Sequence, residues 1–166
     1  MKALKSALWD SPISSKSIFE SRKTISNLQP WKDGLLFLIT EPSEGNINVL
    51  MYSDANSVTN RVSPKGINIR SKVHEYGGRP FIASGNDIYY CNFDDQEIYT
   101  QSIQKDSNSF SKPTAVTNSL GDNVRYVDLT FDKSRNRLIA VREDHRKANG
   151  YEAVSYTHLT LPTSYA

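Results

Sequence analysis

The sequence predicts an all-β protein, in the form of a partial β-propeller with about three four-stranded blades. Short runs of β-branched and aromatic residues follow one another along the chain, and turn residues separate them. No stretch after residue 30 shows the sustained apolar spacing of an amphipathic helix. A pattern of turn, apolar strand and hairpin recurs at Leu36, Ile88 and Leu138. Its spacing of roughly 50 residues is typical of propeller blades, whereas a β-sandwich lacks a fixed long period.

The individual strands are expected where these runs alternate with turns. In chain order they are Gly34–Ile39, Ile47–Tyr52, Pro80–Ser84, Asp87–Asn92, Gln96–Ile103, Thr114–Thr117, Val124–Phe131 and Arg137–Arg142. We expect a lead-in segment at 1–30, in which 16–26 fits a helix or an irregular segment equally. The propeller portion is expected at 31–153, with blades near 31–70, 71–120 and 121–153.

The last residues differ in composition from the rest. The segment 154–166 reads VSYTHLTLPTSYA and contains no Asp, Glu, Lys or Arg. It resembles the translation of a sequencing adaptor, and we therefore expect it to be a non-native tail and exclude it from fold reasoning. The alternative is a genuine Thr-rich strand. If the tail is foreign, the natural sequence is interrupted near Ala153, and whatever follows lies outside this chain.

Composition and charge exclude several classes of function. The 166 residues carry 20 basic and 18 acidic side chains, a net charge of +2, which predicts neither a nucleic-acid nor a membrane partner. The longest apolar run, Leu35–Ile39, is far shorter than the about 20 residues of a membrane span. The N-terminus lacks the apolar core of a secretion signal, so we expect a cytoplasmic protein. The single cysteine, Cys91, excludes an internal disulfide and reads as a small buried hydrophobe.

Six strings of the sequence match a known family in order and with fitting spacing. They are WDSPIS (9–14), EPSEGNINVL (41–50), RSKVHEYGG (70–78), NFDDQEIY (92–99), RYVDLTFD (125–132) and VREDH (141–145). On these strings the chain resembles the N-terminal propeller of the prolyl oligopeptidase family of serine peptidases, in its dipeptidyl aminopeptidase or acylaminoacyl peptidase branch. It departs from the family at Glu41, where Arg is usual, and at Arg79, where a third glycine is usual.

The resemblance implies a hydrolase with two domains. A propeller of about seven or eight blades would sit over a C-terminal α/β-hydrolase domain with a Ser-Asp-His triad, and would admit short peptides to it. This chain would hold about three blades and lack the hydrolase domain. Because it contains no G-x-S-x-G turn, we assign no catalytic residue, no cofactor and no metal site. Two other functions stay open: a non-catalytic propeller that serves as a binding scaffold, and a metal-dependent small-molecule hydrolase.

The VHEYGG segment holds the first group of candidate residues. In the functional interpretation His74, Glu75 and Tyr76 line the substrate tunnel or face the hydrolase domain, and Glu75 binds a peptide amino terminus. The interpretation that we favour is a structural corner, in which Glu75 and Tyr76 hydrogen-bond to neighbouring backbone.

The VREDH segment holds the second group, Arg142 and Glu143 followed by Asp144 and His145. A metal site is disfavoured there, because adjacent residues of a strand point to opposite faces and do not reach one ion. We expect an ion pair at a blade edge or a contact between domains.

Overall fold

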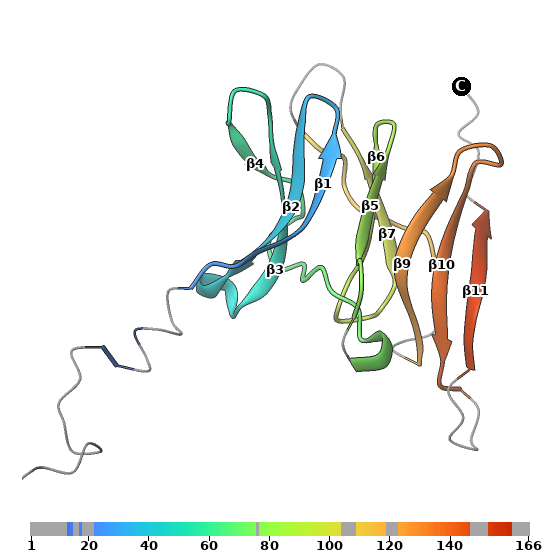
Figure 1. Ribbon diagram of the computed structural model, residues 1–166. Coiled ribbons are helices and arrows are strands. Elements are labelled where there is room, and N and C mark those ends of the chain that lie inside the picture. The colour runs from blue at the N-terminus through green and yellow to red at the C-terminus, as the bar shows by residue number, and fades with distance from the viewer. Residues whose placement is uncertain are drawn as a thin grey trace, which may run out of the picture.

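The computed structural model describes residues 13–14, 17, 22–75, 77–103, 109–118, 123–146 and 153–160. Their strands form three antiparallel sheets that lie side by side (Figure 1). The first sheet contains, in order, β1 (Ile25–Trp31), β2 (Gly34–Glu41), β3 (Ile47–Ser53) and β4 (Thr59–Arg61). The second contains β5 (Phe81–Ser84), β6 (Asp87–Cys91), β7 (Ile98–Ser102) and β8 (Thr114–Ala115). The third contains β9 (Val124–Asp132), β10 (Arg137–Asp144) and β11 (Ala153–Thr160), with β10 in the middle. The described residues also contain two 3₁₀ turns, η2 (Pro42–Glu44) and η3 (Val73–Glu75).

The all-β class predicted from the sequence is confirmed. Each of the eight expected strands is present, with ends that differ by only a few residues. The three sheets follow the three expected repeats, and each sheet is an up-and-down meander in which neighbours in sequence are hydrogen-bonded. The number of blades in a longer protein, and the closure of those blades into a ring, stay predictions.

The first strand begins inside the segment that the sequence assigns to the lead-in. β1 starts at Ile25, so an irregular segment reaching to residue 30 is wrong at its C-terminal end, and Ser26 is extended rather than helical. The register of β1 against β2 shifts between Ser26 and Gln29. Asn27, within this bulge, has a φ of 51°. The bulge breaks the alternation of apolar and polar residues by which a strand is recognised.

The C-terminal segment that was excluded from fold reasoning takes part in the fold. β11 pairs antiparallel with β10 along its whole length, from Ala153 opposite Asp144 to Thr160 opposite Arg137. The strand prediction made no statement about 154–166, and residues 154–160 of this segment form most of β11. Uncharged β-branched and aromatic residues favour a strand, and the free edge of β10 offers unpaired backbone groups to it. The adaptor origin of the segment stays a prediction.

Two hydrophobic cores lie between the three sheets, and β6 contributes to both. Ile88 and Tyr90 belong to the core shared with the first sheet. Tyr89 and Cys91 belong to the core shared with the third sheet. Successive side chains of a strand point to opposite faces, so a middle strand that is buried on both sides is apolar throughout.

The first strands of the three sheets lie next to one another. The Gln29 amide donates to the carbonyl oxygen of Ala83 and accepts from its N–H, both at 3.3 Å. The N–H of Asp128 in β9 donates to the carbonyl oxygen of Arg79, just before β5, at 3.1 Å. We call this side of the molecule, formed by β1, β5, β9 and the residues that lead into β5, the converging edge. Hydrogen bonds thus link the first strand of one sheet to the first strand of the next sheet, or to the residues that lead into it.

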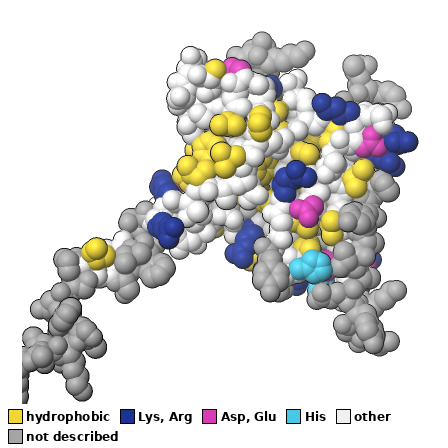
Figure 2. Space-filling view, in the orientation of Figure 1, with side chains coloured by type: hydrophobic (Ala, Val, Ile, Leu, Met, Phe, Trp, Pro, Cys, Tyr) yellow, Lys and Arg dark blue, Asp and Glu magenta, His cyan; other side chains and the backbone are white. Residues whose placement is uncertain are grey.

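One face of the first sheet has no covering sheet among the described residues. Ile25 is 58% exposed, Leu28 63% and Leu35 41%. Figure 2 shows hydrophobic side chains gathered on the surface of this sheet. Large apolar side chains grouped in this way are unusual for a self-sufficient surface and indicate a contact face.

Within the part of the chain that the structure describes, no helix has the length and apolar character needed to span a bilayer.

Candidate functional site

The two segments singled out in the sequence, VHEYGG and VREDH, meet in the structure. His74 comes from the turn η3 that precedes the second sheet, and Glu143 comes from the end of β10 in the third sheet. The backbone N–H of His74 donates to Oε1 of Glu143 at 3.2 Å. The Nδ1 atom of the His74 ring lies 3.3 Å from the same oxygen. One carboxylate therefore connects the turn before the second sheet to the third sheet.

The side chain of Glu143 is fully buried, and several hydrogen-bond donors surround its carboxylate. Nη1 of Arg125 lies 3.4 Å from Oε2, and Nε2 of His145 lies 3.0 Å from the same atom. Arg125 is the direct cross-strand neighbour of Glu143 in the β9–β10 pair. Burial alone raises the pKa of Glu143, but the hydrogen bonds from His145 and from the His74 N–H outweigh it, so the pKa is lowered. The carboxylate is therefore ionised at neutral pH.

The backbone around His74 is shaped to make these contacts. His74 has a φ of 50°, in the left-handed region that non-glycine residues adopt at a cost. The N–H of Gly77 donates to the carbonyl oxygen of Val73 at 2.9 Å and closes the turn. Nη1 of Arg125 also donates to the carbonyl oxygen of Lys72 at 3.0 Å. The turn is therefore held from inside by its own backbone and from outside by the third sheet.

The strand geometry separates the four residues of the REDH run into two pairs. Glu143 and His145 contact each other on one side of β10. Arg142 and Asp144 form an ion pair of their own, and Arg146 also pairs with Asp144. Arg142 and Arg146 line a cavity of about 370 Å³ next to Val116 and Leu159. Arg142 is thus placed away from Glu143, in line with the expected ion pair and alternation of faces.

The other residues predicted from VHEYGG are placed only in part. Glu75 is the last residue of η3, and Tyr76 lies outside the described residues. His74 is the member whose side chain the structure places, with half of its surface exposed. The interpretation as a structural corner concerns the side chains of Glu75 and Tyr76, so it stays a prediction. Sequence reasoning missed Arg125 as a partner, although the pairing of the two adjacent strands brings it opposite Glu143.

In the Glu143 cluster the imidazole rings of His74 and His145 both contact one buried carboxylate. In the described part of the chain, no group of three or more His, Cys, Asp or Glu side chains is arranged to hold a metal ion. The oxygens of Glu143 are already engaged by protein donors, so the cluster does not offer them to an ion or a cofactor.

A second place of interest lies on the converging edge, around Arg79. The backbone N–H of Arg79 donates to Oδ1 of Asp128 at 2.9 Å. The Nη2 atom of its side chain contacts Oγ1 of Thr130 at 3.4 Å. The sequence marks Arg79 only as a departure from a family pattern, and nothing in the sequence indicates that Asp128 and Thr130 are its neighbours.

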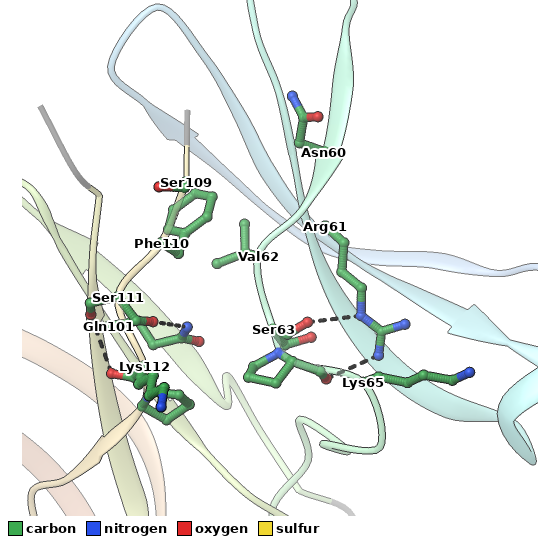
Figure 3. A pocket seen from close by; sticks show the side chains of 12 residues that line it. Asn60, Arg61, Val62, Ser63, Lys65, Gln101, Ser109, Phe110, Ser111 and Lys112 are labelled. Carbon is green, nitrogen blue, oxygen red and sulfur yellow. Dashed lines mark hydrogen bonds between the residues drawn. The ribbon is translucent and has the colours of Figure 1, made fainter. Parts of the chain in front are cut away.

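A groove of about 500 Å³ separates the outer parts of the first two sheets (Figure 3). Phe110 and Val62 face one another across it, and Gln101 donates to the carbonyl oxygen of Ser111 on one wall at 2.7 Å. On the other wall Arg61 donates to the carbonyl oxygens of Ser63 and Pro64. Arg61 also forms an ion pair with Glu44, so its guanidinium is fully used within the protein. The sheets thus lie close together at the converging edge and farther apart at their outer strands.

Comparison with known proteins gives matches at the level of structure. No family model and no curated protein sequence matches the chain. A puromycin-hydrolysing peptidase of Mycobacterium tuberculosis is similar with a TM-score of 0.70 and 23% identity, over 90% of this chain and 23% of the peptidase. Two crystal structures of puromycin hydrolase, one of them a serine-to-alanine variant complexed with PGG, are similar with TM-scores of 0.69 and 21% identity. They match over 82% of this chain and 21% of their own length.

The first of these neighbours is a peptidase and the other two are hydrolases, and all three act on puromycin. The chain spans less than a quarter of the length of the proteins it matches. At this identity the likeness establishes the fold: the three described sheets have the fold of part of a puromycin-hydrolysing peptidase.

Proposed function

We propose that the chain is part of the propeller of a serine peptidase that hydrolyses short peptides. In this proposal the catalytic Ser, Asp and His belong to an α/β-hydrolase domain outside the chain, and the propeller admits peptides to that domain. The observation that carries the proposal is the structural match to a puromycin-hydrolysing peptidase over 90% of the chain. The six family strings support it independently, because they depend on residue identity rather than on shape.

The geometry supports the proposal that this portion is part of a ring of sheets around an axis. Sheets that converge at their first strands and separate at their outer strands form a wedge, and wedges of this kind surround an axis when more of them are added. The Glu143 cluster then fixes the corner at His74 between two neighbouring blades, at one end of the converging edge. Peptides that travel along the axis would pass this corner.

The experiment is to recover the source DNA beyond codon 153 and to express the longer protein. We expect a downstream G-x-S-x-G turn followed by Asp and His, and hydrolysis of puromycin and of short peptide p-nitroanilides. Replacement of that serine by alanine should abolish turnover, and the chain 1–166 alone should have none.

Two outcomes would overturn the proposal. A reading frame that ends after further blades, without the serine turn, would favour a binding scaffold. Turnover that survives the serine replacement but is lost with a chelator would favour a metal-dependent hydrolase.

A further inference from the structure

Arg79 occupies a position that recurs in all three blades. Left-handed residues stand at Asn27, Gly77 and Asp128, with φ of 51°, 70° and 53°. They follow one another at roughly 50 residues, which is the period of the blades. The residue two positions after each of them is Gln29, Arg79 and Thr130. Gln29 reaches forward to Ala83 of the next sheet, and Arg79 reaches forward to Thr130 of the next sheet.

The backbone of Arg79 is fixed on both sides. Its N–H donates to Oδ1 of Asp128, and its carbonyl oxygen accepts from the N–H of the same residue. At Gly78, an added Cβ would lie 2.7 Å from Oδ1 of Asp128 and 2.8 Å from Cγ2 of Val127. Only glycine allows this close approach, and the approach sets where the Arg79 side chain leaves the converging edge.

The guanidinium of Arg79 differs in its surroundings from the other arginines that hold the fold. Five of these arginines each pair with a carboxylate: Arg61, Arg125, Arg137, Arg142 and Arg146. Arg79 is exposed, and its side chain contacts the neutral hydroxyl of Thr130. The Oδ1 atom of nearby Asp128 is engaged by the Arg79 backbone N–H. Among the described residues, no carboxylate forms an ion pair with Arg79, so the positive charge is left for a ligand.

We propose that Arg79 binds a carboxylate of the peptide that moves along the converging edge, and so favours peptides that carry one. The inference rests on the proposed function and names a substrate class for it. A guanidinium presents a planar fork of N–H donors that matches a carboxylate in two parallel hydrogen bonds. A free C-terminus and an acidic side chain offer the same group.

The test uses the longer protein with Arg79→Gln and Arg79→Lys, and three forms of one short peptide: the free acid, the C-terminal amide, and an amide with an internal Glu. Hydrolysis gives kcat/KM for each form. Calorimetric titration of the serine-to-alanine variant gives peptide binding independently of turnover. The matched control is Arg135→Gln, since Arg135 is an exposed arginine on the β9–β10 turn, far along the chain from Arg79.

We expect Arg79→Gln to lower kcat/KM for the free acid about three- to tenfold, the range of an exposed to half-buried charged hydrogen bond, and to leave the plain amide unchanged. Arg79→Lys should retain part of the preference. A loss for the internal Glu form alone would assign the side chain, rather than the C-terminus, as the source of the carboxylate.

If Arg79→Gln leaves both the free acid and the internal Glu form unchanged relative to the plain amide, the inference is overturned and the proposed function stands. If the longer protein hydrolyses no peptide but binds the acid in a manner that depends on Arg79, the proposed function fails and the inference stands. If neither hydrolysis nor binding of the acid depends on Arg79, the inference is wrong.

Discussion

Glu143 accepts a hydrogen bond from the backbone N–H of His74, a residue 69 positions earlier in the chain. The contact joins the turn before the second sheet to the third sheet through one buried carboxylate. Because its other neighbours are the Arg125 guanidinium and the His145 ring, the carboxylate is at the centre of a network rather than in a single pair. Such a network is costly to break at its centre, since the donors that remain are left without their acceptor.

The first prediction concerns this centre. Glu143→Gln keeps the volume of the side chain but removes the charge, and leaves Arg125 and the His74 turn poorly paired. We expect a loss of about 2–3 kcal/mol in the free energy of unfolding. Urea unfolding followed by tryptophan fluorescence measures it. Glu41→Gln is the control, because Glu41 lies at the surface, where it pairs with the largely exposed Lys23 and accepts from Ser43, and its replacement should cost clearly less than that of Glu143. Equal losses for both variants would contradict the central role of Glu143.

The second prediction is the pH dependence of the same group. The pKa of Glu143 is lowered from its ordinary value of 4.5, so the folded protein binds this proton less tightly than the unfolded chain. Its contribution to stability is therefore complete above about pH 4.5, and it is lost as the pH falls below that value and through the lower pKa of the folded state. The difference in Tm between wild type and Glu143→Gln should stay constant from about pH 7 to about pH 5 and shrink as the pH is lowered further. A difference that stays constant below about pH 5 as well would show that the charge does not stabilise the fold.

The third prediction tests the close approach at Gly78. In Gly78→Ala the added methyl group meets Val127 and the carboxylate of Asp128, which is held by the Arg79 N–H. We expect a cost of about 1–3 kcal/mol, measured by urea unfolding. Asp128→Ala in the same chain removes one of the two clashes, so the double variant should lose less than the sum of the single losses. Strict additivity would place the origin of the cost elsewhere.

The fourth prediction is that Cys91 does not react in the folded chain. The side chain is fully buried, and its Sγ donates to the carbonyl oxygen of Tyr126 at 3.2 Å. Burial raises the pKa of the Cys91 thiol, so the reactive thiolate is scarce. A thiol reagent such as Ellman's reagent should modify it only after urea is added. Rapid modification without denaturant would mean that the second core opens readily.

The fifth prediction concerns the exposed face of the first sheet. Because Leu28 and Leu35 are large, apolar and exposed, we expect the isolated chain 1–166 to self-associate. Leu28→Lys combined with Leu35→Lys should shift it toward monomer in sedimentation velocity. The control is Val58→Lys, which adds a charge at an exposed apolar residue in the loop before β4. If Val58→Lys has the same effect, the association depends on net charge and not on this face. The double variant also serves as background for the unfolding measurements.

The fold was predictable where strands alternate with clear turns. Ile88 to Cys91 and Leu138 to Val141 are short apolar runs with turn residues on each side, and both became strands at the expected positions. β1 was missed because its bulge at Asn27 and the residues Gln29 and Pro30 break the alternation. Gln29 of β1 is polar because it bonds to Ala83 of the next sheet. A local sequence pattern does not reveal a contact between two sheets.

The candidate site was predictable in its segments but not in its connections. VHEYGG and VREDH were recognised as unusual strings, yet the contact between His74 and Glu143 depends on how two sheets pack. The alternation of strand side chains correctly separated Arg142 from Glu143. The contacts of Arg79 depend on the left-handed backbone conformation of Asp128. Aspartate tolerates this conformation but does not require it, so the sequence does not indicate it.

The double burial of β6 has a consequence for how the molecule comes apart. A register shift of this strand by one residue would move Ile88 and Tyr90 into the core that holds Tyr89 and Cys91, and the reverse. The packing against both neighbouring sheets would then be wrong. Neither interface is therefore free to rearrange while the other stays intact. A substitution that destabilises the core on one side of the middle sheet should also destabilise the core on its other side. The three sheets should therefore unfold in one cooperative transition.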